Sequence, residues 1–213
     1  MSPAPEGPLP AEAFARILLE REPRFGAALD SAALTRLSAY LAELDRWRRT
    51  TNLTGLLSPA DLADHALEAS LASPLLSDGE RVVDIGSGGG FPGLPLAICR
   101  PAVSFVLLEP RKKRAAFLRH VVRALPLENS SVEEARIQNV GGQTFDVATT
   151  RAVGGFSSWI GEAAFLRRGG RLLAWTTDPE AVARELGSRF RLTREIAVPG
   201  STSRRIALFS LEP

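Results

Sequence analysis

The sequence RVVDIGSGGGFPG, residues 81–93, decides how the rest of this chain is interpreted. Its first five residues form a short apolar run, which predicts a buried strand. Glycine occupies four of the next five positions, so the backbone there can turn tightly and approach a ligand with no Cβ in the way. Pro92 and Pro95 then favour the first turn of a helix. A strand, a glycine loop and a helix N-terminus in this order predict a site for a nucleotide-type ligand.

Two patterns overlap in this stretch, and a glycine turn that binds nothing is a third interpretation. Gly88, Gly90 and Gly93 satisfy the dinucleotide pattern GxGxxG, and Glu109 follows at the distance of a ribose-binding carboxylate. Asp84 before alternating glycines instead resembles motif I of the S-adenosylmethionine-dependent methyltransferases. Asp84 favours that second pattern, because a pyrophosphate site has no use for a carboxylate there, whereas S-adenosylmethionine carries a positive amino group and a sulfonium. The cofactor-binding residues predicted here are Asp84, Gly86, Gly88, Gly90 and Glu109.

The composition bounds the class of protein. With 213 residues, 45% hydrophobic and 23% charged, the chain suits one α/β domain with an extension. No apolar run reaches the roughly 20 residues of a membrane span, and the first residues lack the features of a signal peptide. The only cysteine is Cys99, which fits a reducing cytosol, so we expect a cytoplasmic protein. Residues 1–75 carry a net charge of −3 and residues 76–213 one of +5, which permits a nucleic-acid partner without requiring one.

The pattern along the chain predicts a helical extension over residues 1–75 and a Rossmann-like core over residues 76–213. From residue 80 onward strands alternate with helices, which indicates an α/β fold with a mainly parallel, seven-stranded sheet that finishes in an antiparallel hairpin. His65 and His120 have no Cys or acidic cluster beside them, so no metal site is predicted. The predicted helices are 11–22, one from about residue 30, 58–73, 111–125, 156–167 and one opened by residues 178–180; the predicted strands are 81–85, 103–108, 129–132, 145–150, 171–176, 190–198 and 204–211.

Short motifs occur in a fixed order over residues 34–211. They are Trp47 with Asn52-Leu53-Thr54, His65, DIGSGGGFPG at 84–93, Arg100-Pro101, LLE at 107–109, Lys113-Arg114 with Phe117-Leu118-Arg119, Phe145-Asp146 and Thr150-Arg151-Ala152. In this combination the chain resembles the small-subunit (16S) ribosomal RNA guanine-N7 methyltransferases, the RsmG or GidB family. The resemblance implies a class I fold, S-adenosylmethionine as cofactor, and ribosomal RNA or the small ribosomal subunit as partner.

The same resemblance assigns roles to individual residues. It places Gly86 and Phe91 in the cofactor pocket, Ile137 and Gln138 beside the adenine, and Arg151 at the mouth of the site. Arg151 also follows the fourth predicted strand, at the sheet edge where open α/β folds bind ligands. Two basic patches could bind RNA phosphates, or they could be ordinary solvent-exposed surface. They contain Lys113 and Arg114 in one, and Arg48 beside Asn52 in the other.

These assignments predict that the protein catalyses methyl transfer by placing N7 of the guanine in line with the methyl group. N7 of guanine has a free lone pair and needs no general base, so Arg151 is expected to orient the base or its phosphate. The chain departs from the family at Arg48, Gln138, Glu68-Ala69 and near Thr176, where a lysine is usual. A non-catalytic or altered-specificity RNA-binding relative therefore remains an alternative, as does a nicotinamide-dependent reductase. We expect a monomer that needs no metal.

Overall fold

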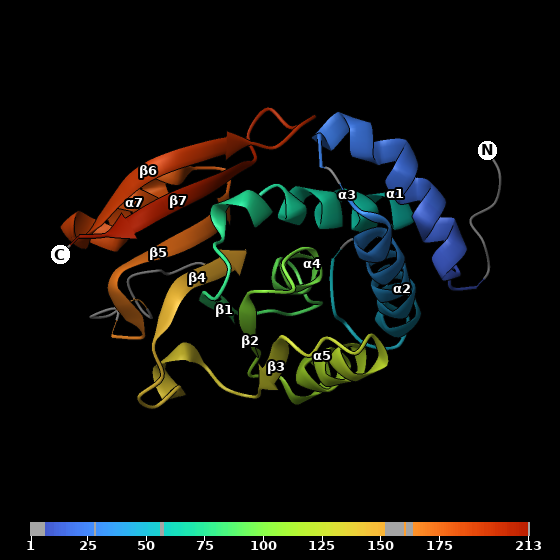
Figure 1. The fold of residues 1–213 in the computed structure, drawn as a ribbon, viewed down its shortest axis with the longest axis horizontal. Coiled ribbons are helices and arrows are strands. Elements are labelled where there is room, and N and C mark those ends of the chain that lie inside the picture. Colours follow the sequence, from blue (N-terminus) through green and yellow to red (C-terminus); the bar gives the residue numbers. More distant parts are fainter. Residues whose placement is uncertain (1–6, 28, 56–57, 152–159, 161–163, 213) are drawn as a thin grey trace.

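One mixed sheet runs through the computed structural model, which describes residues 7–27, 29–55, 58–151, 160 and 164–212 (Figure 1). The strand order is β3-β2-β1-β4-β5-β7-β6; β7 is antiparallel to both of its neighbours and the remaining pairs are parallel. The predicted seven-stranded, mainly parallel sheet with a final hairpin is confirmed. The strands are β1 Arg81–Ile85, β2 Ser104–Leu108, β3 Ser130–Glu133, β4 Phe145–Arg151, β5 Leu166–Thr176, β6 Phe190–Ala197 and β7 Arg205–Leu211.

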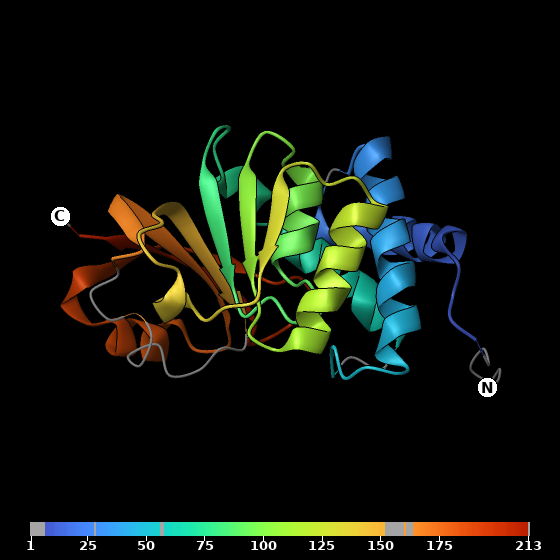
Figure 2. The same ribbon diagram turned by 90° about the horizontal axis from the view of Figure 1, so that it is seen from below.

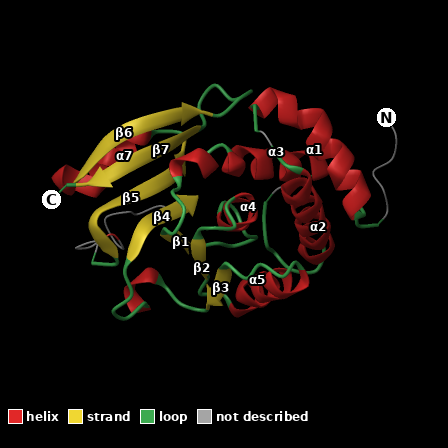
Figure 3. Ribbon diagram, in the orientation of Figure 1, coloured by secondary structure: helices red, strands yellow, loops and turns green. Residues whose placement is uncertain are grey.

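Helices cover both faces of the sheet, in layers that the view turned by 90° separates (Figure 2). Figure 3 distinguishes the helices from the strands by colour. Helices α1 to α5 pack on one face, with the N-terminal pair outermost, and α7 lies on the other face. The α-helices are α1 Ala11–Phe25, α2 Ser31–Arg48, α3 Pro59–Ser70, α4 Gly93–Cys99, α5 Lys112–Ala124 and α7 Pro179–Leu186; the short 3₁₀ turns are η1 Ser73–Leu75, η2 Ile137–Asn139 and η3 Gly187–Arg189.

Local capping explains where the N-terminal helices begin and end. The Asp30 carboxylate accepts from the Ala33 N–H at 2.7 Å, which confirms the predicted start of α2. Helix α1 runs three residues further than predicted, to a C-cap at Gly26 with φ 63°. Helix α3 instead ends at Ser70, three residues earlier than predicted, because the Pro74 ring would clash with the carbonyl four residues before it.

The N-terminal helices share a core with the sheet. Leu37, Leu41 and Leu44 of α2 are fully buried in the same cluster as Val82 and Leu107 of the strands. The apolar face of α2 therefore packs against the part of the chain that follows it. The division into two domains at residue 75 stays a prediction.

Strand β5 differs most from the sequence-based expectation. It begins at Leu166, five residues before the predicted start, and its pairing with β4 shifts register between Phe145 and Val147. Gly169, at φ 73°, and Gly170 lie inside this strand, so the glycine pair forms an irregularity in a strand and not the turn before one. The helix predicted over residues 156–167 falls largely outside the described residues, and its last two residues belong to β5.

Candidate functional site

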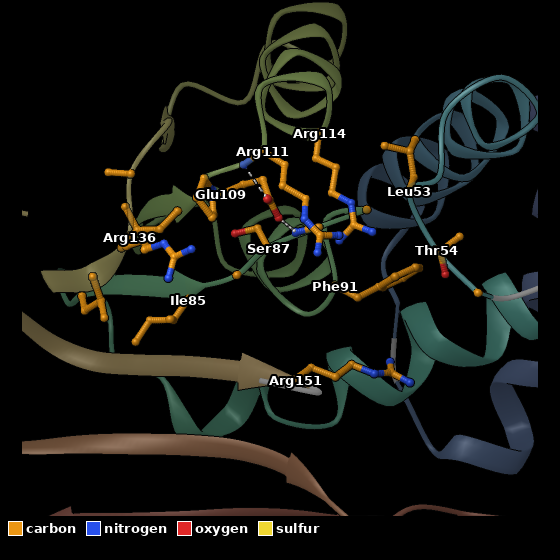
Figure 4. Close-up of a pocket in the computed structure, with 18 of the residues that line it drawn as sticks. Leu53, Thr54, Ile85, Ser87, Phe91, Glu109, Arg111, Arg114, Arg136 and Arg151 are labelled. Carbon is orange, nitrogen blue, oxygen red and sulfur yellow. Dashed lines mark hydrogen bonds between the residues drawn. The ribbon is translucent and has the colours of Figure 1, made fainter. Parts of the chain in front are cut away.

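A cavity of about 550 Å³ opens at the carboxyl ends of β1, β2 and β4 (Figure 4). Open α/β sheets bind their ligands at this edge, because the loops that follow the strands meet there. Its described lining residues are Leu53, Thr54, Gly55, Ile85, Gly86, Ser87, Gly88, Gly89, Phe91, Leu108, Glu109, Pro110, Arg111, Arg114, Ala135, Arg136, Ile137, Gln138 and Arg151. The structure therefore brings together eight of the predicted site residues: Gly86, Gly88, Phe91, Glu109, Arg114, Ile137, Gln138 and Arg151.

The glycine loop, residues 86–90, forms the floor of the cavity through its backbone. The N–H groups of Gly86 and Ser87 both donate to the Leu108 carbonyl at 2.9 Å, which anchors the loop to the end of β2. Gly86 and Gly88 have φ values of 75° and 55°, which favour glycine strongly over other residues. The loop therefore presents backbone, with no side chain at these positions, to a ligand.

Glu109 ends β2 and projects a buried carboxylate into the cavity wall. Its Oε2 accepts from the Gly88 N–H at 3.0 Å and its Oε1 from the Arg111 N–H at 2.8 Å. These bonds fix the carboxylate and leave each oxygen able to accept once more. That capacity suits two adjacent hydroxyls of a ribose.

Asp84 supports the loop from beneath and does not line the cavity. Its side chain is fully buried; Oδ1 accepts from the Thr149 hydroxyl at 2.9 Å and Oδ2 from the Gly93 N–H at 3.2 Å. Burial raises the pKa of this carboxyl to about 6. A Cβ on Gly93 would approach Asp84 Oδ2 to 2.5 Å, so glycine at 93 serves packing on Asp84. The predicted direct contact between Asp84 and a cofactor is not part of this geometry.

Gly90, the last residue of the loop, is not among the lining residues and packs against Leu94 and Tyr40. At φ 103°, it would place a Cβ 2.4 Å from Leu94 Cδ1 and 2.9 Å from the Tyr40 hydroxyl. The Tyr40 hydroxyl itself donates to the Gly89 carbonyl at 2.7 Å, and burial raises the pKa of Tyr40 well above its usual value. The N-terminal extension thus holds the glycine loop, a role that no local pattern around Tyr40 indicated.

The connection between α2 and α3 closes one side of the cavity. Leu53, Thr54 and Gly55 line it, and the Arg114 Nε donates to the Asn52 carbonyl at 3.0 Å. Leu53 is buried, whereas Asn52 is exposed and does not line the cavity. The motif Asn52-Leu53-Thr54 was the only signal in the sequence for this wall.

Four arginines surround the opening and are named here the arginine rim: Arg111, Arg114, Arg136 and Arg151. In Figure 4, Arg111 and Arg114 project side by side from the start of α5, and Arg151 lies on the opposite side. Among the described lining residues Glu109 carries the one negative charge, so the lining has a net charge of +3. This field attracts anions such as nucleic-acid phosphates.

Arg151 ends β4, as predicted, and its guanidinium meets a histidine from α3. Its Nη2 lies 3.1 Å from His65 Nε2. Burial, with the charges of Arg151 and Arg204, lowers the pKa of His65 from 6.5 to about 3, so the imidazole is neutral at neutral pH. Because a guanidinium can only donate, Nε2 is the acceptor.

Two of the predicted RNA-binding residues, Arg48 and Lys113, lie away from the cavity lining, as does Thr176, a position at which the chain departs from the family. Arg48 bonds through its Nε to Asp45 Oδ1 at 2.8 Å, at the end of α2. Lys113 is exposed on α5. Thr176, where the family usually has a lysine, accepts from the Asp178 N–H at 3.0 Å through its hydroxyl. The roles of Arg48 and Lys113 toward RNA stay predictions.

The described residues contain no group of three or more His, Cys, Asp or Glu side chains arranged to hold a metal ion. Within the same part of the chain, no helix combines the length and the apolar character that a bilayer crossing requires.

Comparison with known proteins points to one family. A family model described as "GidB: rRNA small subunit methyltransferase G" matches residues 33–188. The ribosomal RNA small subunit methyltransferase G of Sorangium cellulosum is 41% identical over 153 residues, 68% of this chain and 62% of that protein, so the match spans less than two thirds of that relative. The protein of the same name from Syntrophotalea carbinolica is 34% identical over 183 residues, 83% of this chain and 84% of that protein.

Solved structures agree on the fold. A SAM-dependent methyltransferase from Aquifex aeolicus superimposes with a TM-score of 0.55 at 15% identity, over 65% of this chain and 85% of that one. At this identity the likeness concerns the fold alone. The predicted Rossmann-like class I methyltransferase fold is confirmed.

Proposed function

The chain belongs to the ribosomal RNA small subunit methyltransferase G family, and on that premise we propose that it methylates N7 of a guanine in small-subunit (16S) ribosomal RNA. S-adenosylmethionine is the proposed methyl donor. One observation carries the proposal: a single cavity combines a glycine floor and a ribose-type carboxylate with an arginine rim. The first two suit a nucleoside, and the rim suits a polyanion.

The cavity residues fit S-adenosylmethionine. The loop at Gly86 and Gly88 offers backbone without side chains, and Glu109 holds acceptor capacity for ribose hydroxyls. Ile137, 6% exposed, gives an apolar surface for an adenine, with Gln138 next to it. Phe91 and Arg151 also line the cavity. When bound, the cofactor supplies an electrophilic methyl group.

The proposed contribution of the protein to catalysis is to position the base relative to the methyl donor. The N7 lone pair needs no deprotonation, so no residue is assigned as a general base. Arg151 is the proposed catalytic residue, because its charged side chain can donate to the base or to a flanking phosphate at the cavity edge. Asp84 beneath the loop and Gly90 at its end support its shape.

The arginine rim is the proposed entry for RNA. Arg111, Arg114 and Arg136 face the same opening, and Lys113 extends the positive surface along α5. A loop or otherwise unstacked guanine is the expected target, since a base inside a duplex cannot reach the cavity. We propose that the protein works in the cytoplasm as a monomer, on ribosomal RNA or on the small subunit.

Two assays test the function. Calorimetry should detect binding of S-adenosylmethionine and S-adenosylhomocysteine, and none of NAD or NADP. Small subunits from cells that lack the enzyme should then accept a methyl group, detected by N7-methylguanine-specific chain cleavage and mapped by primer extension.

The outcomes separate the alternatives. Tight NADH binding without an S-adenosylmethionine signal would support a nicotinamide-dependent reductase. Cofactor binding without methyl transfer to any subunit preparation would support a non-catalytic relative. Transfer to a guanine atom other than N7 would contradict the proposed mechanism and keep the cofactor assignment.

A further inference from the structure

Arg151 and three other polar side chains, His65, Glu68 and Arg204, form a cluster at one edge of the cavity. His65 and Glu68 lie three residues apart on α3, Arg151 ends β4, and Arg204 immediately precedes β7. His65 is 8% exposed and Glu68 2% exposed, so these two side chains are buried, whereas the Arg204 side chain is 31% exposed. Of its members only Arg151 lines the cavity.

The contacts form a chain that leads away from the cavity. Arg151 Nη2 donates to His65 Nε2 at 3.1 Å, and His65 Nδ1 faces Glu68 Oε2 at 3.6 Å. The same Glu68 oxygen accepts from Arg204 Nη1 at 2.5 Å. Glu68 is thereby held by an ion pair with Arg204, and its carboxyl group faces the Nδ1 side of the imidazole; burial raises the pKa of Glu68.

The contact with Arg151 determines which ring nitrogen of His65 carries the proton. Nε2 must be unprotonated to accept from a guanidinium, so the proton of the neutral ring is on Nδ1. That N–H points toward the Glu68 carboxylate but finds no hydrogen-bond partner among the described residues. A protonated imidazole would place N–H donors toward Arg151 as well, and the contact would become repulsive.

We propose that His65 is a positioning residue for Arg151, which it holds at the cavity edge by accepting from Nη2, while the Glu68 carboxylate, paired with Arg204, faces the Nδ1 side of the imidazole. One N–H group of Arg151 is thus hydrogen-bonded to His65, and the remaining N–H groups of Arg151 are oriented toward the cavity. The inference rests on the proposed role of Arg151 in methyl transfer. It assigns His65 no contact with cofactor or RNA.

A matched pair of substitutions isolates the Nε2 contact. His65→Gln keeps an acceptor at the reach of Nε2, whereas His65→Asn keeps a polar group only at the reach of Nδ1. We expect His65→Asn to lower kcat roughly 10- to 100-fold, as for loss of a hydrogen bond to a charged group. The affinity for S-adenosylmethionine should stay within about twofold, and His65→Gln should recover most of the rate. His120→Asn, at the other histidine of the chain, is the control.

The tautomer gives a readout on the unaltered protein. With two histidines in the chain, the imidazole nitrogens of ¹⁵N-labelled protein can be assigned. At neutral pH, His65 should show a protonated Nδ1 and an unprotonated Nε2, and Arg151→Ala should shift the Nε2 signal. A proton on Nε2 would overturn the inference even if the His65 variants fail to fold.

The outcomes distinguish this inference from the proposed function. If Arg151→Ala keeps full activity, the role of Arg151 fails, and the inference with it. If Arg151→Ala is impaired while His65→Asn is not, only the inference fails. If His65→Asn slows an Arg151→Ala background as much as it slows the wild type, His65 does not act through Arg151.

Discussion

The glycine loop and the arginine rim bound the same cavity by different means. The loop, residues 86–90, is largely buried and is shaped by its backbone, with Leu108, Glu109 and Tyr40 as hydrogen-bond partners. The rim is made of charged side chains that come from separate elements, from the start of α5 to the end of β4. One region therefore determines the shape of the site, and the other determines its charge.

Because the loop is shaped by backbone and the rim by charged side chains, we expect the two regions to have separate functions. A backbone-lined floor can recognise a ligand by close approach, and small changes there should alter cofactor affinity. Positively charged side chains at an opening act on a developing or approaching negative charge, and changes there should alter turnover and RNA binding. Each variant below tests whether one region can be disturbed without the other.

The largest effect is expected at the rim, from Arg151→Ala. Loss of a charge-assisted contact in a partly dry site should cost about 2–4 kcal/mol, or a factor of about 30 to 1000 in methyl transfer. The affinity for S-adenosylmethionine should fall less than kcat does, because the loop and Glu109 are untouched. Single-turnover transfer to small subunits and calorimetry with the cofactor measure the two quantities separately.

Arg191→Ala is the matched control for that experiment. Arg191 is 69% exposed on β6 and pairs with Glu212 at 2.6 Å. Its loss should leave transfer unchanged, since exposed ion pairs contribute about 0–1 kcal/mol. Near-wild-type transfer by Arg151→Ala as well would remove Arg151 from the site.

A pH-dependent effect is expected beneath the loop, at Asp84. Its pKa is raised from 3.8 to about 6, mainly by burial, so the folded state binds more protons than the unfolded state between these values. Its contribution to the free energy of unfolding is present below about pH 4 and is lost as the pH rises through about 6. Asp84→Asn removes this titration, so relative to wild type it should gain about 3 kcal/mol between about pH 4 and pH 7.

Urea unfolding across that pH range measures the Asp84 effect. Glu180→Gln, at a side chain 87% exposed, is the control and should show no pH-dependent difference from wild type. A constant difference between Asp84→Asn and wild type at every pH would mean that the carboxyl titrates normally in the folded protein.

The same contrast explains how much could be predicted from the sequence. The glycine loop, Glu109 and the hairpin were predicted because neighbouring residues carry their signals: alternating glycines, a strand end and a short turn. The strand that carries Asp84 was also predicted, but not the bonds of its carboxylate to Thr149 and Gly93 beneath the loop. A sequence pattern gives the position of a carboxylate, whereas burial and packing decide where its oxygens point.

Contacts between distant residues could not be predicted. Arg151 and His65 are 86 residues apart, and Tyr40 and the Gly89 carbonyl are 49 apart. Nothing in the local sequence of α2 or α3 indicates what lies opposite them. Likewise, the final hairpin was predicted, but the insertion of β7 between β5 and β6 depends on the whole sheet.

The smallest expected effect is at Tyr40, where the N-terminal extension holds the loop. Tyr40→Phe removes only the hydroxyl that donates to the Gly89 carbonyl and keeps the ring against Phe91, 5.6 Å between centroids. A lost buried hydrogen bond of about 0.5–1.5 kcal/mol should raise the dissociation constant for S-adenosylmethionine about 2- to 13-fold, with kcat unchanged at saturating cofactor. Ser38→Ala removes a buried hydroxyl bond from the same helix, to the Leu34 carbonyl at 2.7 Å, and should lower stability without changing that constant. Equal cofactor affinity in both variants would show that the glycine backbone alone fixes the floor of the cavity.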